Sequence, residues 1–203
     1  MLPTHMKDLQ FPINLTFNIG TLSNDFSATD ASGRTIAYVK QKLFKLKEDI
    51  SVYSNDSKTE LLYKIKADRW IDWSAAYSIT YADGTELGKV ARKGWRSLWK
   101  AKYLLVDQHQ KEQFTIEEEN GWVKVWDSLL GEIPILGMLT GYFFNPSYAV
   151  TNLNGRKIVR IKKLPSFFGR KFEISKLEDI DNDDDERVIL GLMMMILLER
   201  RRG

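Results

Sequence analysis

The chain has 203 residues, of which 43% are hydrophobic and 12% aromatic, and its formal net charge is +3. This length fits one large domain or two small ones, and the apolar content is ample for a core. The absence of cysteine excludes disulfides, thiolate zinc sites and a cysteine nucleophile, and only two histidines argue against a histidine-rich metal site.

The charge is unevenly distributed along the chain. Residues 173–203 hold nine acidic and five basic residues, which leaves 18 acidic and 25 basic residues in the remainder, a net charge of +7. A moderately basic body is compatible with anionic lipid, phosphate or nucleic acid, but a charge of this size does not choose among them.

The N-terminal segment, residues 1–20, is predicted to be loosely ordered and to lie outside the folded domain of residues 21–203. It begins MLPTHMKDLQ, which contains no apolar run typical of a secretory signal peptide. We therefore expect a cytoplasmic protein, peripheral to the membrane if it binds lipid.

Three stretches of fifteen residues align without a gap and indicate an internal repeat. They are FSATDASGRTIAYVK from Phe26, YSITYADGTELGKVA from Tyr77 and YAVTNLNGRKIVRIK from Tyr148. Each has glycine at its eighth position, preceded by serine, aspartate or asparagine. Asp-Gly and Asn-Gly favour two-residue hairpins with a type I′ turn, so each repeat is predicted to be a β-hairpin.

Each repeat continues into a cationic corner that contains aromatic residues, followed by another strand. The corners fall in VKQKLFKLKEDISVY, VARKGWRSLWKAKYLLV and IKKLPSFFGRKFEIS. In the first and third corners the cations are Lys40, Lys42, Lys45, Lys162, Lys163, Arg170 and Lys171. Repetition favours a structural role for the corners, but they would form a cationic rim if the fold gathered them at one end. In total, ten to twelve strands are predicted before residue 178.

The chain finishes with a helix predicted at about residues 184–200. Val188–Leu198 is apolar all round, and a helix without a polar face must be buried on every side. Eleven residues span roughly 16 Å, whereas a membrane span needs about 20 apolar residues, so no transmembrane span is predicted. Asp183, Asp184 or Asp185 is expected to cap its start, and arginines follow its end.

A run of strands followed by one wholly apolar helix has a simple packing solution. A closed barrel of this many strands has an interior that its own side chains do not fill. A helix through the middle fills the interior, and barrel closure removes exposed sheet edges. The fold class predicted from the residues is therefore mainly β, a closed antiparallel barrel around a central C-terminal helix.

The stretch AYVKQKLFKLKEDISVY, with the preceding DASGRT, resembles the repeated unit of the LURP-one-related proteins. This family is grouped with the tubby C-terminal domain and the phospholipid scramblases. The resemblance implies a tubby-like barrel of twelve strands around a hydrophobic C-terminal helix, over roughly residues 20–200. Tubby-type domains bind phosphoinositide headgroups, and scramblase-type proteins act at membranes, but no residue-by-residue match transfers either site.

The candidate binding site comes from the charge pattern of RKGWRSLWKAKY. Its cations alternate with tryptophans, a pattern typical of an anionic lipid interface. The predicted ligand-binding residues are Arg92, Lys93, Arg96, Lys100 and Lys102. Nucleic acid could use the same pattern by base stacking, although no nucleic acid partner is expected. The alternative is a barrel corner with buried tryptophans and solvated cations.

Two other segments are candidate sites. The acidic run EDIDNDDDE, residues 178–186, fails the calcium-loop pattern at its glycine and final acidic positions. It is better explained as a solvated linker that caps the helix. The apolar stretch GEIPILGMLTGYFF, residues 131–144, fits an irregular wall of the barrel better than a loop that contacts lipid.

No catalytic residues, metal site or cofactor are predicted, since no phosphate-binding loop and no G-x-S-x-G elbow occurs in the sequence. The sequence therefore predicts a binding or scaffold module for anionic membrane phospholipids or phosphoinositides, or for a protein partner. Two alternatives stay open. One is an enzyme with a cleft built across barrel strands, and the other is a scramblase-like membrane protein.

Overall fold

A computed structural model describes most of the chain. The described residues are 6, 8–18, 24–41, 49–68, 76–93, 102–119, 146–166, 170–179 and 182–200. The side chains of residues 93, 182 and 183 are not described. Among the sequence predictions, the Asn120–Gly121 hairpin and the apolar stretch at 131–144 lie outside the described residues.

The described residues form twelve strands and the helix α3 (Asn182–Arg200). The strands are β1 (Ile13–Phe17), β2 (Phe26–Thr29), β3 (Thr35–Gln41), β4 (Asp49–Tyr53), β5 (Leu61–Ala67), β6 (Ala76–Tyr81), β7 (Glu86–Lys93), β8 (Lys102–Asp107), β9 (Glu112–Glu118), β10 (Ser147–Asn152), β11 (Lys157–Leu164) and β12 (Lys171–Lys176).

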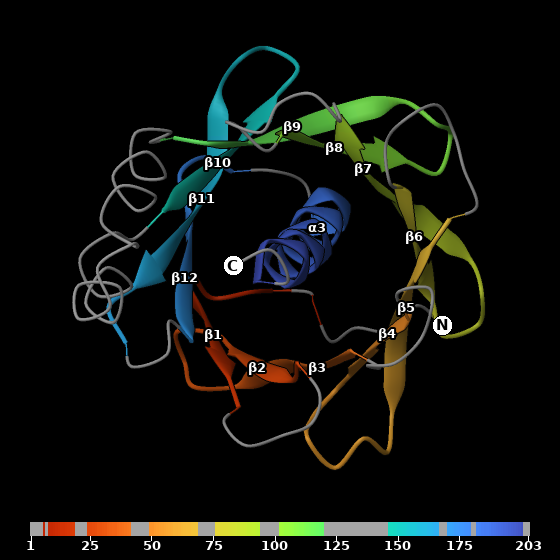
Figure 1. Cartoon of the computed structure of the whole chain (residues 1–203), viewed down its shortest axis with the longest axis vertical. Helices are drawn as coiled ribbons and strands as arrows, with labels where there is room; N and C mark the ends of the chain where they lie inside the picture. The colour runs from red at the N-terminus through yellow and green to blue at the C-terminus, as the bar shows by residue number, and fades with distance from the viewer. Residues whose placement is uncertain are drawn as a thin grey trace, which may run out of the picture.

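The strands follow one another around a closed barrel. Each strand pairs with the next in the chain, and β1 pairs with β12 to close the circle. Every pairing is antiparallel, and α3 runs through the middle of the ring (Figure 1). The predicted closed antiparallel barrel around a C-terminal helix is thus confirmed.

β1 corrects the predicted domain boundary. Residues 1–20 were expected to lie outside the domain, but Ile13 and Leu15 are fully buried and β1 is the strand that closes the barrel. Met6 also belongs to the core, with 2% of its surface exposed. The sequence missed this strand because its four polar and apolar alternations are too few to be distinguished from a linker.

The three predicted repeats occupy equivalent places, four strands apart in the barrel. They form the hairpins β2–β3, β6–β7 and β10–β11. The strand register shifts at the same repeat position in each, after Ala28, Ile79 and Val150. Sequence repetition is therefore matched by an approximate threefold repetition of the barrel wall.

The predicted turn type is wrong, although the hairpins are confirmed. A type I′ turn requires positive φ at both central residues, but in each repeat only the glycine has it. The φ angles are +84° for Gly33, +93° for Gly84 and +77° for Gly155. In the first hairpin the Gly33 N–H donates to the Asp30 carbonyl at 2.9 Å, and Asp30 N–H donates to the Arg34 carbonyl at 3.0 Å. These are three-residue loops that end in a glycine bulge.

The helix α3 is enclosed, as its sequence predicted. Val188, Met194 and Leu197 have 0% exposed surface. The helix begins two residues before the predicted start at 184 and ends at the predicted Arg200. Gly191 lets it approach the wall closely, because a Cβ there would lie 2.4 Å from Cδ2 of Leu105 on β8.

Two glutamates fix α3 at both ends of the barrel. Near its start, Glu186 accepts hydrogen bonds from the hydroxyl groups of Tyr63 and Tyr81, the latter at 2.8 Å. Near its end, Glu199 accepts a hydrogen bond from the Tyr103 hydroxyl at 2.6 Å. Burial and the adjacent carboxylate both raise the pKa of Tyr63 and of Tyr103, so both phenols stay neutral donors. An apolar helix could slide along an apolar tube, and these contacts set its depth.

Replacing Tyr81 by Phe should lower the free energy of unfolding by about 1–3 kcal/mol, because it removes one donor from a buried carboxylate. Tyr53→Phe serves as the control, since Tyr53 is half-buried and lies outside this cluster. Equilibrium denaturation in urea measures both variants. Equal stability of the two would contradict the anchoring role of Glu186.

Replacing Gly88 by Ala should be more costly than replacing Gly155 by Ala. Gly88 has φ +152°, and a Cβ there would lie 2.3 Å from the backbone carbonyl oxygen of Val106, which cannot move aside. We expect a loss of about 2–4 kcal/mol. At Gly155 nothing lies within 4 Å, so only the left-handed conformation matters, at about 1 kcal/mol. Thermal and urea unfolding would test this order, and a reversed order would contradict it.

Candidate functional site

The barrel topology places all three cationic corners at one end. Because neighbouring strands are antiparallel and follow chain order, all odd-numbered strands finish at the same end. We call this the corner end, and the opposite end, where even-numbered strands finish, the turn end. The corners leave the barrel from β3, β7 and β11, so they are spaced four strands apart around one rim. The strand ends that flank the three corners thus lie at one end, and a cationic rim formed by their side chains stays a prediction.

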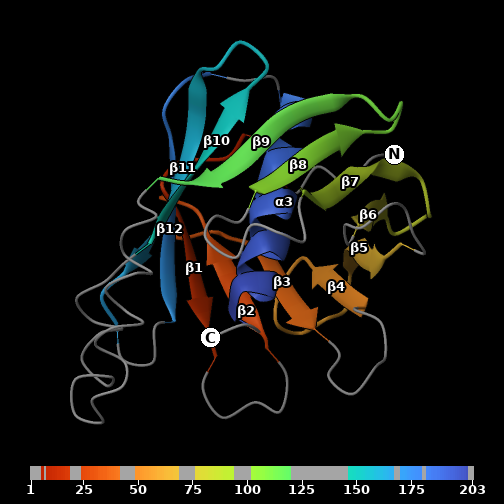
Figure 2. The same cartoon turned by 45° about the horizontal axis from the view of Figure 1, so that its top comes forward.

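The helix α3 also ends at the corner end. Figure 2 shows β1 and β3 pointing toward the end where the C-terminus lies. The Arg200 guanidinium lies 4.1 Å from the ring centroid of Phe17, the last residue of β1. In the sequence Arg201 and Arg202 follow immediately. Cations here complement the negative end of the helix dipole as well as adding to the rim.

Some cations of the corner end face outward into solvent. Lys162 and Lys171 are exposed, and Lys40 is half-buried. Lys162 directly follows Ile161, which is buried in the core, and Lys171 directly precedes the buried Phe172. Since successive side chains of a strand point to opposite faces, both lysines stand on the outer face. These lysines are the described residues best placed to meet a large anionic surface.

Other cations of this end face the interior. Arg92 is opposite Tyr103 in the β7–β8 register, and Tyr103 points inward to Glu199. Phe17 N–H donates to the Arg170 carbonyl at 2.9 Å, which extends the β1–β12 ladder and places Arg170 on the inner face, like Phe172. The Nε atoms of Arg92 and Arg170 are buried and make no hydrogen bond. At least two arginines of the corner end, Arg92 and Arg170, therefore lie on the inner side of the wall.

The predicted site residues do not share one face. Arg92 faces inward, whereas Lys102 faces outward and forms an ion pair with Glu117 across β8 and β9, with an Nζ–Oε1 distance of 2.5 Å. Both partners of this pair are about half exposed, so the pair contributes little to stability. Arg96, Lys100 and the side chain of Lys93 lie outside the described residues. Ligand binding by this set stays a prediction.

The turn end has the opposite character. Here the acidic run approaches the barrel, and the Lys176 ammonium lies 3.0 Å from Oδ2 of Asp185 and 3.6 Å from Oδ1 of Asp179. Burial raises the pKa of Asp185, while Lys176 lowers it to a smaller extent. Arg187 donates to the Leu87 carbonyl at 3.1 Å and to Asp184 at 2.6 Å. The contacts of Lys176 and Arg187 thus hold the start of α3 against β12 and β7. The predicted caps Asp183, Asp184 and Asp185 lie within the first turn of the helix, because α3 begins at Asn182.

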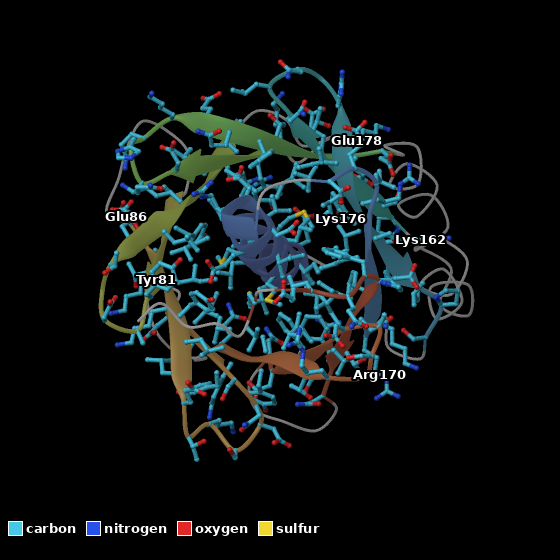
Figure 3. The ribbon with its side chains drawn as sticks, turned by 180° about the vertical axis from the view of Figure 1, so that it is seen from behind. Tyr81, Glu86, Lys162, Arg170, Lys176 and Glu178 are labelled. Atoms are coloured by element: carbon cyan, nitrogen blue, oxygen red, sulfur yellow. The ribbon has the colours of Figure 1, made fainter. Side chains whose placement is uncertain are left out.

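Figure 3 shows Lys162 and Arg170 on the side formed by β11, β12 and β1, with Tyr81 and Glu86 across the barrel. Among the residues that the structure describes, no group of three or more His, Asp or Glu side chains is placed to hold a metal ion. No described helix is long and apolar enough to cross a membrane.

A charged cluster on the outer wall was missed by sequence reasoning. Glu119, just after β9, accepts from Lys157 at 2.7 Å, from Arg160 Nε at 2.7 Å and from the Ser147 hydroxyl at 3.1 Å. Burial alone would raise the pKa of Glu119, but the hydrogen bonds from Arg160, Lys157 and Ser147 outweigh it and lower the pKa to about 2. The partners are separated by 28 to 41 residues, so no local pattern indicates the cluster.

Residues 35–130 match the model of the LURP-one-related family. This match confirms the resemblance to the LURP-one-related proteins over those residues, and a tubby-like fold is consistent with it. No match to the chain is found among curated proteins or among solved structures. The matched part covers the first two corners, and the strands that flank the third, β11 and β12, continue the same order of strands beyond it.

Replacing Glu119 by Gln should lower stability at pH 7 by about 1 kcal/mol, since its partners are partly exposed. The folded pKa of about 2 lies below the ordinary value of 4.5, so this contribution is fully present above pH 4.5. It is lost as the pH falls from about 4.5 toward 2, and the two proteins should then become equally stable. Urea denaturation across this pH range measures the difference.

Glu117→Gln is the matched control, because Glu117 contacts only the exposed Lys102 among the ion pairs of the described residues. Its effect at pH 7 should be below about 0.5 kcal/mol. If Glu119→Gln and Glu117→Gln behaved alike at every pH, the Glu119 cluster would not be a stabilising feature of the wall.

Proposed function

We propose that this protein is a non-enzymatic binding module whose ligand is anionic membrane phospholipid, bound at the corner end. The single observation that carries the proposal is the convergence of the three cationic corners and the end of α3 on one rim. A membrane is broad and flat, so it can meet one whole end of a barrel at several points. A small soluble anion would need one enclosed pocket instead.

The difference in charge between the two ends of the barrel supports an orientation in which the corner end meets the membrane. The acidic run and the acidic start of α3 lie at the turn end, where β12 finishes. An anionic surface would repel that end and attract the opposite one. Each Lys or Arg near an anionic leaflet contributes about 1 kcal/mol to binding, so several moderately placed cations suffice without a specific pocket.

The interior argues for binding at the rim instead of chemistry inside. The apolar helix fills the centre, with Ile189, Leu192 and Met193 fully buried. The interior carboxylates Glu186 and Glu199 are engaged by tyrosine hydroxyl groups that hold the helix in place. Holding the helix in place explains the position of these two carboxylates. The cations on the surface are therefore the residues that we assign to ligand binding.

Binding should be tested by co-sedimentation with phosphatidylcholine vesicles, with and without phosphatidylserine, at low ionic strength. We expect binding only to the anionic vesicles, and loss of binding as salt is added. A third set of vesicles carrying phosphoinositide at the same surface charge distinguishes general attraction from headgroup recognition. No sedimentation with either anionic set at low salt would refute the proposal.

The variant Lys162→Gln/Lys171→Gln removes two outward cations from the corner end. It should weaken binding about 10-fold to 30-fold, from about 1 kcal/mol for each charge. The matched control, Lys111→Gln/Arg156→Gln, removes the same charge from exposed turns at the turn end. It should leave binding unchanged, and equal losses in both variants would show that the corner end has no special role.

A further inference from the structure

A group of three basic residues lies on the inner side of the corner end, next to two phenylalanine rings. Lys163 comes from the end of β11, Arg170 directly precedes β12, and Arg200 ends α3. The rings are those of Phe17 and Phe172, whose centroids lie 6.0 Å apart. We call Lys163, Arg170 and Arg200 the inner cation cluster, which the wall and the helix build together.

Strand register places the inner cation cluster beside this pair of rings. Lys163 is opposite Phe172 in the β11–β12 pairing, and Arg170 is opposite Phe17, whose N–H donates to its carbonyl. Directly opposite residues of an antiparallel pair share a face and have Cβ atoms about 4.5–5.5 Å apart. The Arg200 guanidinium joins them, since it lies 4.1 Å from the ring centroid of Phe17.

The backbone of Arg170 is fixed by a side chain of the same corner. Ser166 Oγ accepts from the Arg170 N–H at 3.0 Å and from the Lys171 N–H at 3.2 Å, and it donates to the Leu164 carbonyl at 3.3 Å. The Nε atom of Arg170 is nevertheless buried without a hydrogen bond. Because a buried donor without an acceptor costs free energy, this guanidinium is placed to receive an acceptor from a ligand.

The acidic residues around the inner cation cluster have other neighbours in the strand register. Glu199 accepts a hydrogen bond from Tyr103 on β8, four strands from β12. Glu118 is opposite Tyr148 in the β9–β10 pairing, two strands from β11. Glu173 lies between two inward residues of β12, so it stands on the outer face. Basic residues therefore outnumber acidic ones on the inner side here, among the residues that the structure describes.

Partial burial makes this excess of positive charge unfavourable. Burial lowers the pKa of Arg200, because it removes water from around the guanidinium. Like charges held close together repel more strongly where water is scarce. A bound anion would offset this repulsion and would also supply the acceptor that Arg170 Nε lacks.

The chemistry of the cluster favours a phosphate monoester over a phosphodiester or a carboxylate. A monoester carries about 1.5 to 2 negative charges at pH 7 and three terminal oxygens. A phosphodiester or a carboxylate carries a single charge. Guanidinium groups bind phosphate oxygens with paired hydrogen bonds, and a lysine adds a point charge, so two arginines and one lysine match the larger charge.

We infer that the inner cation cluster binds one phosphate monoester group. This inference rests on the proposed function for the source of the group, which is the headgroup of a lipid in the membrane that the corner end meets. The outward Lys162 and Lys171 attract the barrel to any anionic membrane, whereas the inner cation cluster selects among anionic lipids.

The test compares two sets of phosphatidylcholine vesicles, one with phosphatidic acid and one with phosphatidylserine, adjusted to the same surface charge. Only phosphatidic acid carries a monoester. We expect the full chain to bind the phosphatidic acid set about tenfold more tightly, from the additional charge-assisted hydrogen bonds. Equal binding to both sets would overturn the inference and leave the proposed function standing.

Glycerol 3-phosphate distinguishes a lipid headgroup from a free phosphate ester. Competition by millimolar glycerol 3-phosphate that removes only the preference for phosphatidic acid would show that the cluster also accepts the free group. A preference that persists would assign the site to lipid. If neither set of vesicles binds, the proposed function is overturned, and protection against urea by glycerol 3-phosphate would then assign the cluster to a soluble ester.

The variant Arg170→Gln should abolish the preference for phosphatidic acid, and Arg170→Lys should restore part of it, because lysine keeps the charge without the paired hydrogen bonds. Lys171→Gln is the matched control, since it removes one charge from the adjacent outward residue. It should weaken binding to both sets by the same factor and keep the preference.

An unchanged preference in Arg170→Gln would contradict the assignment of the inner cation cluster. Circular dichroism checks that each variant is folded. If Arg170→Gln does not fold, the comparison of the two vesicle sets and the glycerol 3-phosphate competition still decide the matter on the unaltered protein.

Discussion

The structure depends on one constraint, which is that α3 has no polar face. A helix that is apolar on every side is stable in water only if something surrounds it completely, and a closed barrel of twelve strands is too wide to be filled by its own side chains. Each element therefore supplies what the other lacks. Gly191 lets the helix approach β8, and the tyrosine contacts of Glu186 and Glu199 fix how deep it sits. The hydrophobic effect encloses the helix, and the hydrogen bonds choose its position.

The direction of the helix gives the barrel two unlike ends. Its start is at the turn end, where the Lys176–Asp185 ion pair and the hydrogen bond from Arg187 to the Leu87 carbonyl tie it to the wall. Its end emerges among the cationic corners, where basic residues also suit the negative end of the dipole. Helix capping alone would thus produce some of this charge asymmetry. It does not explain the outward lysines on β11 and β12.

The repeats show how much of a fold a local pattern can predict. The shared glycines predicted three hairpins, and the register shifts recur after Ala28, Ile79 and Val150. The turn type was wrong because the residue before each glycine tolerates both kinds of hairpin, and the bulge that decides between them depends on the twist of the paired strands. β1 was missed because an alternation of only five residues carries little information without its neighbours β2 and β12.

The sequence by itself determined the fold class, the enclosed helix and the threefold repetition. These follow from the periodicity and apolar content of short segments, which can be read without knowing what the segments contact. Only the tertiary structure decided which cations share a surface. Arg92 and Lys102 are ten residues apart in one basic stretch, yet one faces the interior and the other the solvent. The Glu119 cluster joins strands far apart in the chain. The face on which a side chain lies, and the residues from other strands that it meets, depend on strand register around the closed barrel. Register is a property of the assembled sheet and not of any one segment.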